Sequence, residues 1–340
     1  MKKVGVVILN WNGKELLEKF LPSVLKNTSE ELADVYVVDN ASTDNSVEML
    51  KEKFPQVKIV RLDKNYGYAG GYNKGLESVD ARYVALINSD IEVTEGWLEP
   101  LVETLEKHDK AVAVQPKILW YKEKNKFEHA GASGGFLDKH YYVFCRGRIG
   151  DSLEEDKGQY NDEREIFWAS GAAFLIDKKV FEEVGGFDEY FFAHMEEIDL
   201  AWRLKARGYR LFVNPASVVY HVGGASLDAS SPYKTFLNFR NSIVMIYKNK
   251  KTVFPFLILR LLIDTGLAFT FLFKFKLGHF LAVVKAHCQS YVCMYKHRRN
   301  RKENMKKTVV WEFEEIYPRS ILWQYAVKGI KKFGDLNWKK

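Results

Sequence analysis

The protein has 340 residues, of which 47% are hydrophobic and 14% aromatic, and this composition excludes a disordered or low-complexity chain. Its net charge of +7 is divided unevenly: residues 1–240 carry 31 basic and 38 acidic side chains, whereas residues 241–340 carry 20 basic and 6 acidic ones. An acidic front (net −7) is thus joined to a basic rear (net +14), and we expect the rear to meet an anionic partner.

The first 115 residues alternate short apolar runs with amphipathic stretches. The apolar runs predict buried strands at Val4–Leu9, Val35–Val38, Val57–Leu62, Tyr83–Asn88 and Ala111–Gln115. Helical spacing predicts helices between them at Glu15–Asn27, Ser46–Lys53, Tyr72–Ser78 and Trp97–His108. The alternation indicates an α/β fold with a mostly parallel sheet and helices on both faces, in which ligands bind at the carboxyl ends of the strands.

The middle of the chain is less regular. Residues 120–165 are polar and without a clean period, and we expect a long β-insert over the sheet. Order returns at Ile166–Ile176, and a helix is predicted over Glu196–Arg207. Two further strands are expected at Tyr209–Val213 and Ser217–Tyr220.

The rear contains an almost wholly apolar stretch, Val253–Phe273, which is long enough to span a bilayer. Arg260 and Asp264 near its middle weaken that interpretation, although their i,i+4 spacing lets them pair. An amphipathic stretch, Gly278–Met294, is followed by a basic cluster of Lys296, Arg298, Arg299, Arg301, Lys302, Lys306 and Lys307. This pattern favours association with an anionic membrane surface, with a buried helical subdomain and a true span as the alternatives.

Three cysteines, Cys145, Cys288 and Cys293, match no zinc or redox spacing, so no disulfide framework is expected. The first apolar run is too short for a signal-peptide core. We therefore expect a cytosolic protein.

Polar residues follow the first two predicted strands. Asn10 and Asn12 come after the first strand, and Asp39 ends the second. A carboxylate there can accept a hydrogen bond from a ribose hydroxyl or a base N–H. A simple turn, with Ser42 or Asp44 as a helix cap, explains the neighbouring residues equally well.

A glycine-rich segment, residues 65–75, follows the third strand and opens a helix, where backbone can approach an anionic ligand closely. It fits neither the dinucleotide fingerprint nor the Walker loop, which argues against an NAD enzyme and a P-loop ATPase.

The fourth strand ends in Asn88-Ser89-Asp90, which is suited either to a divalent cation or to a simple turn. His221 follows the last predicted strand and is a candidate metal ligand or phosphate contact.

Several acids begin the helix at Glu196. An i,i+4 ion pair with Arg203 explains the presence of Asp199 in this turn. It does not explain the adjacent Glu196 and Glu197, and burial among aromatic rings would raise a carboxyl pKa and suit it to proton transfer.

In this order, the motifs resemble the family-2 glycosyltransferases of the GT-A fold, a Rossmann-like nucleotide-diphospho-sugar transferase fold, and specifically their bacterial rhamnosyltransferase-like branch. The likeness covers about Val4–Gly224 and includes Ser170-Gly171-Ala172-Ala173 and the final His-Val-Gly-Gly. It implies an inverting hexosyltransferase that takes a sugar from a nucleotide donor, either dTDP-rhamnose or a UDP-sugar.

The resemblance also implies roles for individual residues. Asp39, Asn10 and Asn12 are expected to bind the pyrimidine; Asn65, Gly70, Gly71, Asn73 and Asn88 are expected to line the nucleotide. Asp90 and His221 are expected to hold Mg²⁺ or Mn²⁺, with Asn88 in place of the family's first Asp. The base is expected to be Glu197, with Glu196 as the alternative.

We therefore expect a catalytic domain over residues 1–225 and a basic helical membrane region over 226–340. The acceptor would be a saccharide or a polyprenyl-linked saccharide in cell-surface polysaccharide synthesis, reached from the inner face of the plasma membrane. The alternatives are a nucleotidyltransferase-like or inactive GT-A scaffold, and a basic nucleic-acid-binding protein, for which no binding motif is found.

Overall fold

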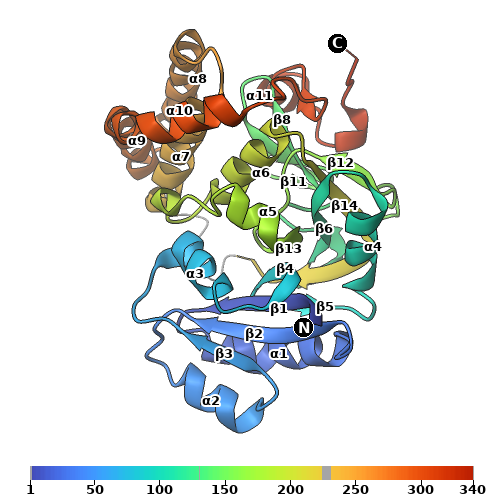
Figure 1. Ribbon diagram of the computed structural model, residues 1–340. Coiled ribbons are helices and arrows are strands. Elements are labelled where there is room, and N and C mark those ends of the chain that lie inside the picture. The colour runs from blue at the N-terminus through green and yellow to red at the C-terminus, as the bar shows by residue number, and fades with distance from the viewer. Residues whose placement is uncertain (1, 130, 224–230, 340) are drawn as a thin grey trace.

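In the computed structural model, which describes residues 2–129, 131–223 and 231–339, ten strands form a central sheet (Figure 1). The strands are β1 (Lys2–Asn10), β2 (Ala33–Asp39), β3 (Lys58–Arg61), β4 (Ala81–Asn88), β5 (Ile91–Val93), β6 (Ala111–Trp120), β7 (Glu123–Phe127), β12 (Arg164–Ile166), β13 (Ala173–Asp177) and β14 (Arg210–His221). Their order is β12-β14-β6-β13-β4-β1-β2-β3, with β5 beside β14 and β7 beside β6. The predicted parallel arrangement is confirmed for β3, β2, β1 and β4, while β13 lies antiparallel between β4 and β6.

Helices cover both faces of this sheet. They are α1 (Lys14–Asn27), α2 (Ser46–Lys53), α3 (Gly67–Leu76), α4 (Glu99–Lys107), α5 (Lys178–Glu183) and α6 (Glu196–Ala206). Along β1 the side chains alternate between two cores: Val6 and Ile8 pack with α1, α2 and α4, whereas Val7 packs with α3, α5 and α6. The predicted fold class is confirmed.

Two boundaries differ from the predictions. Helix α3 begins at Gly67 instead of Tyr72, so the glycine-rich segment forms the helix itself. The two strands predicted around Pro215 are one strand, β14, whose register shifts between Asn214 and Val218. Proline lacks an N–H, so it locally disturbs the pairing of the strand without ending it.

The predicted insert forms a second sheet. Strands β8 (Gly135–Asp138), β9 (Val143–Cys145), β10 (Arg148–Ile149) and β11 (Ser152–Leu153) are joined by β15 (Ile316–Tyr317) from the tail. The tail continues through α11 (Ile321–Ala326) and the short helix η2 (Phe333–Asp335). Trp338 packs against Phe136, so the end of the chain covers this second sheet.

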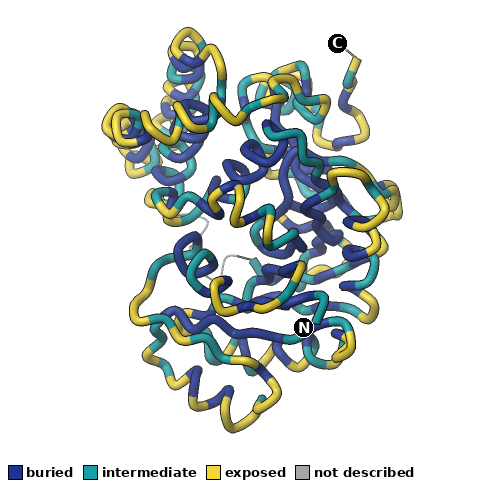
Figure 2. The backbone as a smooth tube through the Cα atoms, in the orientation of Figure 1, coloured by how far each residue is buried: buried dark blue, intermediate teal, exposed yellow. Residues whose placement is uncertain are grey.

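The rear of the chain forms four helices, α7 (Pro232–Asn249), α8 (Phe254–Phe273), α9 (Leu277–Lys296) and α10 (Arg298–Lys307), which stand to one side of the sheet (Figure 1). Figure 2 shows the strands mostly buried and α8 to α10 largely exposed. The predicted Arg260–Asp264 pair is confirmed, with 3.0 Å between Nε and Oδ1. The boundary predicted at 225/226 lies outside the described residues.

Candidate active site

The ends of β1 and β2 form a polar cluster. Asn10 lies opposite Asp39 in the sheet, both side chains are buried, and Asn10 Nδ2 donates to Asp39 Oδ1 (3.1 Å) and Ser42 Oγ (3.0 Å). Asn12 has a left-handed backbone (φ 53°), and its side-chain oxygen accepts from the N–H of Thr43 (2.7 Å). The structure thus brings together Asn10, Asn12 and Asp39 as the strand register requires.

Asn65 joins this edge of the sheet from the segment before α3. Its Oδ1 accepts hydrogen bonds from Asn40 Nδ2 (3.0 Å) and from the N–H of Gly67 (2.8 Å). Since Asn40 directly follows Asp39, these contacts tie the start of α3 to the carboxyl end of β2.

Gly70, Gly71 and Asn73 lie within α3, so the glycine-rich segment forms most of the helix that it was expected only to open. Gly71 permits close packing of the helix on the sheet, because a Cβ there would lie 2.8 Å from the side chain of Leu9. The Asn73 amide donates to the carbonyl oxygen of Phe187 (2.9 Å) and accepts from its N–H (2.9 Å). These residues shape the scaffold beside the site, and their contact with a nucleotide stays a prediction.

Asp90 and His221, the predicted metal ligands, meet across β5 and β14. His221 Nε2 lies 3.2 Å from Asp90 Oδ1, and its Nδ1 lies 3.2 Å from Oε2 of Glu128, a buried residue just after β7. Burial lowers the pKa of the imidazole, but hydrogen bonds and charge from Asp90 and Glu128 outweigh it and raise that pKa to about 10. Burial raises the pKa of the Asp90 carboxyl. The hydrogen bond and the charge of His221 lower it by more, so the pKa of Asp90 lies below its ordinary value.

This pair fits part of a divalent-cation site. Two cis ligands of an octahedral ion at about 2.1 Å lie about 3 Å apart, close to the 3.2 Å between Asp90 and His221. Across residues 2–129, 131–223 and 231–339, no group of three His, Cys, Asp or Glu side chains is arranged to hold an ion unaided. An ion bound here would therefore need further ligands from a substrate or water.

Two adjacent carboxyl groups open α6. Burial raises the pKa of Glu196 well above its ordinary value, and the charge of Glu197 raises it further. Burial also raises the pKa of the half-buried Glu197, to about 7, although N–H groups in the first turn of the helix favour its ionised form. One oxygen of each carboxyl, Oε2, is buried and has no hydrogen-bond partner among the described residues. Glu197 is thus the acid that titrates near neutral pH.

The Ser170–Ala173 segment links these acids to the end of β4. Asn88 donates its backbone N–H to the carbonyl oxygen of Ala172 (2.9 Å), and the hydroxyl of the partly buried Tyr68 donates to that of Gly171 (2.6 Å). Burial raises the pKa of Tyr68 well above its usual range, and the charges of Glu196 and Glu197 add to this. Tyr68 therefore lies within the electrostatic reach of both acids and beside the segment that adjoins Asn88.

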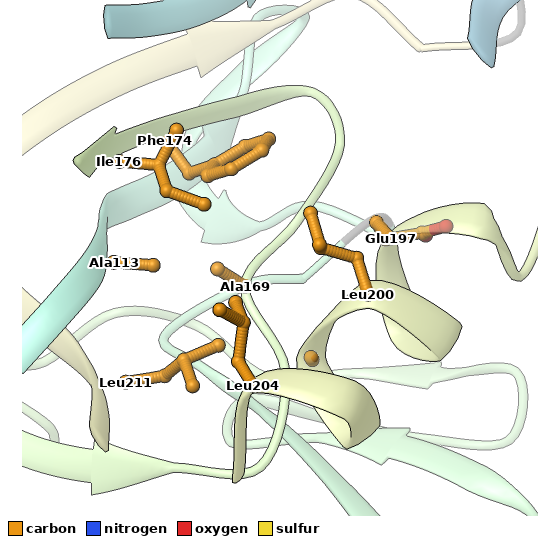
Figure 3. A pocket seen from close by; sticks show the side chains of 9 residues that line it. Ala113, Ala169, Phe174, Ile176, Glu197, Leu200, Leu204 and Leu211 are labelled. Atoms are coloured by element: carbon orange, nitrogen blue, oxygen red, sulfur yellow. The ribbon is translucent and has the colours of Figure 1, made fainter. Parts of the chain in front are cut away.

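Figure 3 shows how Glu197 is oriented. Its methylene groups line a small apolar cavity with Phe174 and Leu200, while its carboxylate points away from these apolar side chains. The carboxylate of Glu197 therefore lies outside the apolar cavity that its methylene groups line.

The sequence analysis did not identify two residues of this site. Glu128 lies in the irregular stretch 120–165, where no periodicity predicts burial, and only the fold brings it to His221. Tyr68 belongs to the glycine-rich motif and is the second residue of α3, and nothing in the sequence distinguishes it from the other tyrosines of that motif.

Comparison with known proteins identifies related sequences. Residues 5–185 match the sequence model of the family described as Glycosyl transferase family 2. An N-acetylglucosaminyl-diphospho-decaprenol L-rhamnosyltransferase from Mycobacterium tuberculosis is 26% identical over 235 residues, covering 64% of this chain and 75% of that protein. A low-salt glycan biosynthesis hexosyltransferase from Haloferax volcanii is 24% identical over 247 residues, covering 70% and 73%.

A solved structure supports the same fold. The crystal structure of GalNAc-T7 with UDP, GalNAc and Mn²⁺ superposes with a TM-score of 0.57 at 18% identity, covering 73% of this chain and 48% of that one. At this identity the likeness concerns the fold alone.

Proposed function

This chain belongs to glycosyl transferase family 2 and is a glycosyltransferase, and from that premise we propose that it moves a sugar, with inversion, from a nucleoside-diphosphate sugar to an acceptor hydroxyl. The observation that carries the proposal is the pair of adjacent acids at the start of α6, buried Glu196 and half-buried Glu197, whose pKa values are both raised. Two further buried carboxylates, Asp39 and Asp90, stand at the end of β2 and just after β4. Family membership favours this reaction over nucleotidyl transfer and over nucleic-acid binding.

The polar cluster at β1 and β2 is the proposed nucleotide end of the site. Asp39 Oδ1 and Oδ2 already accept hydrogen bonds from Asn10 and Ser42, which orient the carboxylate for a further N–H or hydroxyl of the nucleotide. Retained lone pairs allow such an extra contact, because a carboxylate has about four acceptor positions.

Asp90 and His221 are the proposed ligands of Mg²⁺ or Mn²⁺, with the donor diphosphate and water completing the shell. The carboxylates that raise the pKa of His221 would also attract a divalent cation, and the imidazole would have to give up its proton to bind that ion. Such an ion would neutralise charge on the departing diphosphate.

Glu197 is the proposed base. It takes the proton from the acceptor hydroxyl while that oxygen forms a bond to C1 of the sugar. The bond from C1 to the diphosphate oxygen breaks, and the nucleoside diphosphate leaves with the electron pair. A pKa of about 7 suits this role, because the group is then about half ionised at neutral pH and basic enough to accept a proton.

The relatives point to a class of substrate. The names of the mycobacterial and Haloferax proteins specify a rhamnosyl transfer to a polyprenyl-linked sugar and hexosyl transfer in glycan synthesis. We propose a dTDP-rhamnose or UDP-sugar donor and a saccharide or lipid-linked acceptor of cell-surface polysaccharide synthesis.

A donor screen tests this proposal. Purified protein is incubated with dTDP-, UDP- and GDP-sugars and either Mn²⁺ or Mg²⁺, and release of the nucleoside diphosphate is measured. Slow, metal-dependent hydrolysis of one donor is expected; no release from any donor with either ion would contradict the proposal.

We further propose that α8 and α9 lie on the cytoplasmic face of the plasma membrane. By length and composition alone α8 could cross a membrane, with a mean hydropathy of 1.9, but its buried side carries Arg260 and Asp264. Arg260 Nη1 donates to the carbonyl oxygen of His140 (2.9 Å), and the guanidinium lies 3.7 Å from the ring centre of Tyr142. A spanning orientation would break these contacts and place charges in lipid.

The outward side of α8 is apolar instead of polar. Side chains with 44–80% of their surface exposed form a stripe at helical spacing: Phe254, Ile258, Leu262, Phe269 and Phe273. Phe275 at the turn to α9 is 97% exposed and is flanked by Lys274 and Lys276. Apolar side chains bordered by cations match an anionic interface, in which the chains enter the acyl boundary and the cations meet headgroups.

Vesicle flotation tests the membrane surface. The double variant Ile258→Glu/Leu262→Glu is expected to reduce co-flotation with phosphatidylglycerol-rich vesicles at least about tenfold, since it places two carboxylates at an anionic interface. Trp11→Glu is the matched control, because Trp11 is 58% exposed but lies at the end of β1. Unchanged flotation of the double variant would show that this face does not dock.

A further inference from the structure

The segment between the short helix η1 (Glu189–Phe191) and α6 has an unusual backbone. Phe192, His194 and Met195 have φ values of 64°, 67° and 75°, and none of them is glycine. Bulky residues in this region are conformational outliers and persist only where surrounding contacts impose them. Since Glu196 follows directly, the conformation of this segment sets the direction in which the acids of α6 begin.

Asn241 of α7 supplies those contacts. Its side chain is fully buried, and Nδ2 donates to the carbonyl oxygens of Phe191 (3.0 Å), Ala193 (2.9 Å) and His194 (2.7 Å). Arg240 Nε donates to Asn241 Oδ1 (2.8 Å), which fixes the amide with its N–H groups toward the segment. One side chain therefore binds three carbonyls within four consecutive residues.

Lys248, two turns further along α7, holds both flanks of the same segment. Its Nζ lies 2.6 Å from Asp188 Oδ2, just before η1, and 2.8 Å from Asp199 Oδ2 in the first turn of α6. Lys248 and Asp199 are buried, and Asp199 also pairs with Arg203 (2.9 Å). With the flanks fixed by charge pairs, the amide of Asn241 determines the path between them.

We propose that Asn241 is a positioning residue for sugar transfer, which holds residues 191–195 so that α6 presents Glu196 and Glu197 to the acceptor. This inference rests on the proposed function. It explains how Glu196 and Glu197 are oriented, and it takes their chemical role from that proposal. Among the described residues, the structure shows no hydrogen bond from Asn241 to either acid. Asn241 therefore acts through the backbone of the segment that precedes Glu196.

Asn241→Ala tests the proposal, with Asn214→Ala as its control. Asn214 Nδ2 likewise donates to a backbone carbonyl, that of Pro100 (3.2 Å), and to the Thr104 hydroxyl (2.9 Å), but on the far side of the sheet. Asn241→Ala is expected to lower kcat about 100-fold, because misplacement of a catalytic group by about 1 Å has an effect of that size. Dissociation constants for UDP and dTDP with Mn²⁺ should stay within twofold, and Asn214→Ala should leave kcat unchanged.

Hydrogen exchange gives a readout that does not depend on the substrate. Peptides covering residues 188–200 should exchange faster in Asn241→Ala than in the parent, and not in Asn214→Ala. If Asn241→Ala does not fold, Arg240→Gln serves in its place, because it removes the donor that orients the amide and also the hydrogen bond from Arg240 Nη2 to the carbonyl oxygen of Phe191 (3.2 Å). It should raise exchange in the same peptides and lower kcat about tenfold.

The proposal is overturned if a folded Asn241→Ala or Arg240→Gln variant keeps parental kcat and exchange. Failure of the proposed base would be recognised separately, by activity of Glu197→Gln, since the exchange result does not involve the chemistry of that acid.

Discussion

Replacing Glu197 by Gln is expected to reduce sugar transfer by about 10²–10⁴-fold, the usual contribution of a positioned general base. Gln has nearly the same shape but cannot accept the acceptor proton. The nucleotide end, at Asp39, is formed by other elements, so binding of the nucleoside diphosphate with Mn²⁺ should be unchanged. Steady-state transfer rates and titration calorimetry measure the two quantities.

Glu196→Gln is the matched control. Burial and the charge of Glu197 raise the pKa of Glu196 well above its ordinary value, which favours the neutral form of this carboxyl, and an amide resembles that form. We expect this variant to lose at most about tenfold. An inactive Glu196→Gln beside an active Glu197→Gln would reverse the assignment, and full activity of both would contradict a base in this pair.

The pH profile of the parent enzyme follows from the same acid. A base works when ionised, and burial raises the pKa of Glu197 to about 7, so kcat should rise as the pH increases through about 7. The effect on stability has the opposite sign. Since the folded pKa exceeds the ordinary value of 4.5, this group makes the fold less stable as the pH rises from about 4.5 to 7. Above pH 7, Glu197→Gln should therefore melt at a higher temperature than the parent.

Replacing Asp90 by Asn is expected to lower kcat/KM at least about 100-fold, because metal stabilisation of the leaving group amounts to several kcal/mol. The concentration of Mn²⁺ needed for half-maximal donor hydrolysis should rise in parallel, since the carboxylate ligand is lost and only His221 remains. Donor hydrolysis measured across a Mn²⁺ titration reports both changes.

Glu92→Gln provides the comparison for Asp90→Asn. Glu92 lies in β5, two residues along, and pairs with Lys124 near the surface. The Glu92→Gln variant should leave the Mn²⁺ dependence of donor hydrolysis unchanged. Circular dichroism distinguishes a loss of metal from a loss of fold, because Asp90 is also the buried partner of His221. Parental Mn²⁺ dependence in a folded Asp90→Asn variant would refute its role as a ligand.

Much of the site could be predicted from the sequence because it depends on strand register. Asn10, Asp39 and Asn88 each end a buried apolar run, and parallel pairing of such runs brings their ends to one edge of the sheet. The Asp199–Arg203 and Arg260–Asp264 pairs were equally accessible, since i,i+4 spacing on a helix places the partners together.

Other features required contacts between distant segments. Glu128 reaches His221 from a stretch without periodicity, and Asn241 reaches Phe191 from 50 residues away. The same limitation explains the glycines of α3: in sequence they are typical of a loop, and only packing against Leu9 and Val38 shows that a helix needs them there. β15 pairs with β8 across a long separation that no local pattern records.

The sequence by itself determined the sheet, the family and the residue types at the strand ends, because these follow from local periodicity and from motifs in order. Tertiary structure decided how those residues are used. It raised the pKa of one acid to about 7 and of its neighbour well above the ordinary range. Burial raises both pKa values, the charge of Glu197 raises that of Glu196 further, and backbone N–H groups oppose the effect at Glu197. Tertiary structure also turned Arg260 and Asp264 inward, leaving an apolar face outside, because a buried ion pair needs partners, which the β8–β9 turn and His287 of α9 provide.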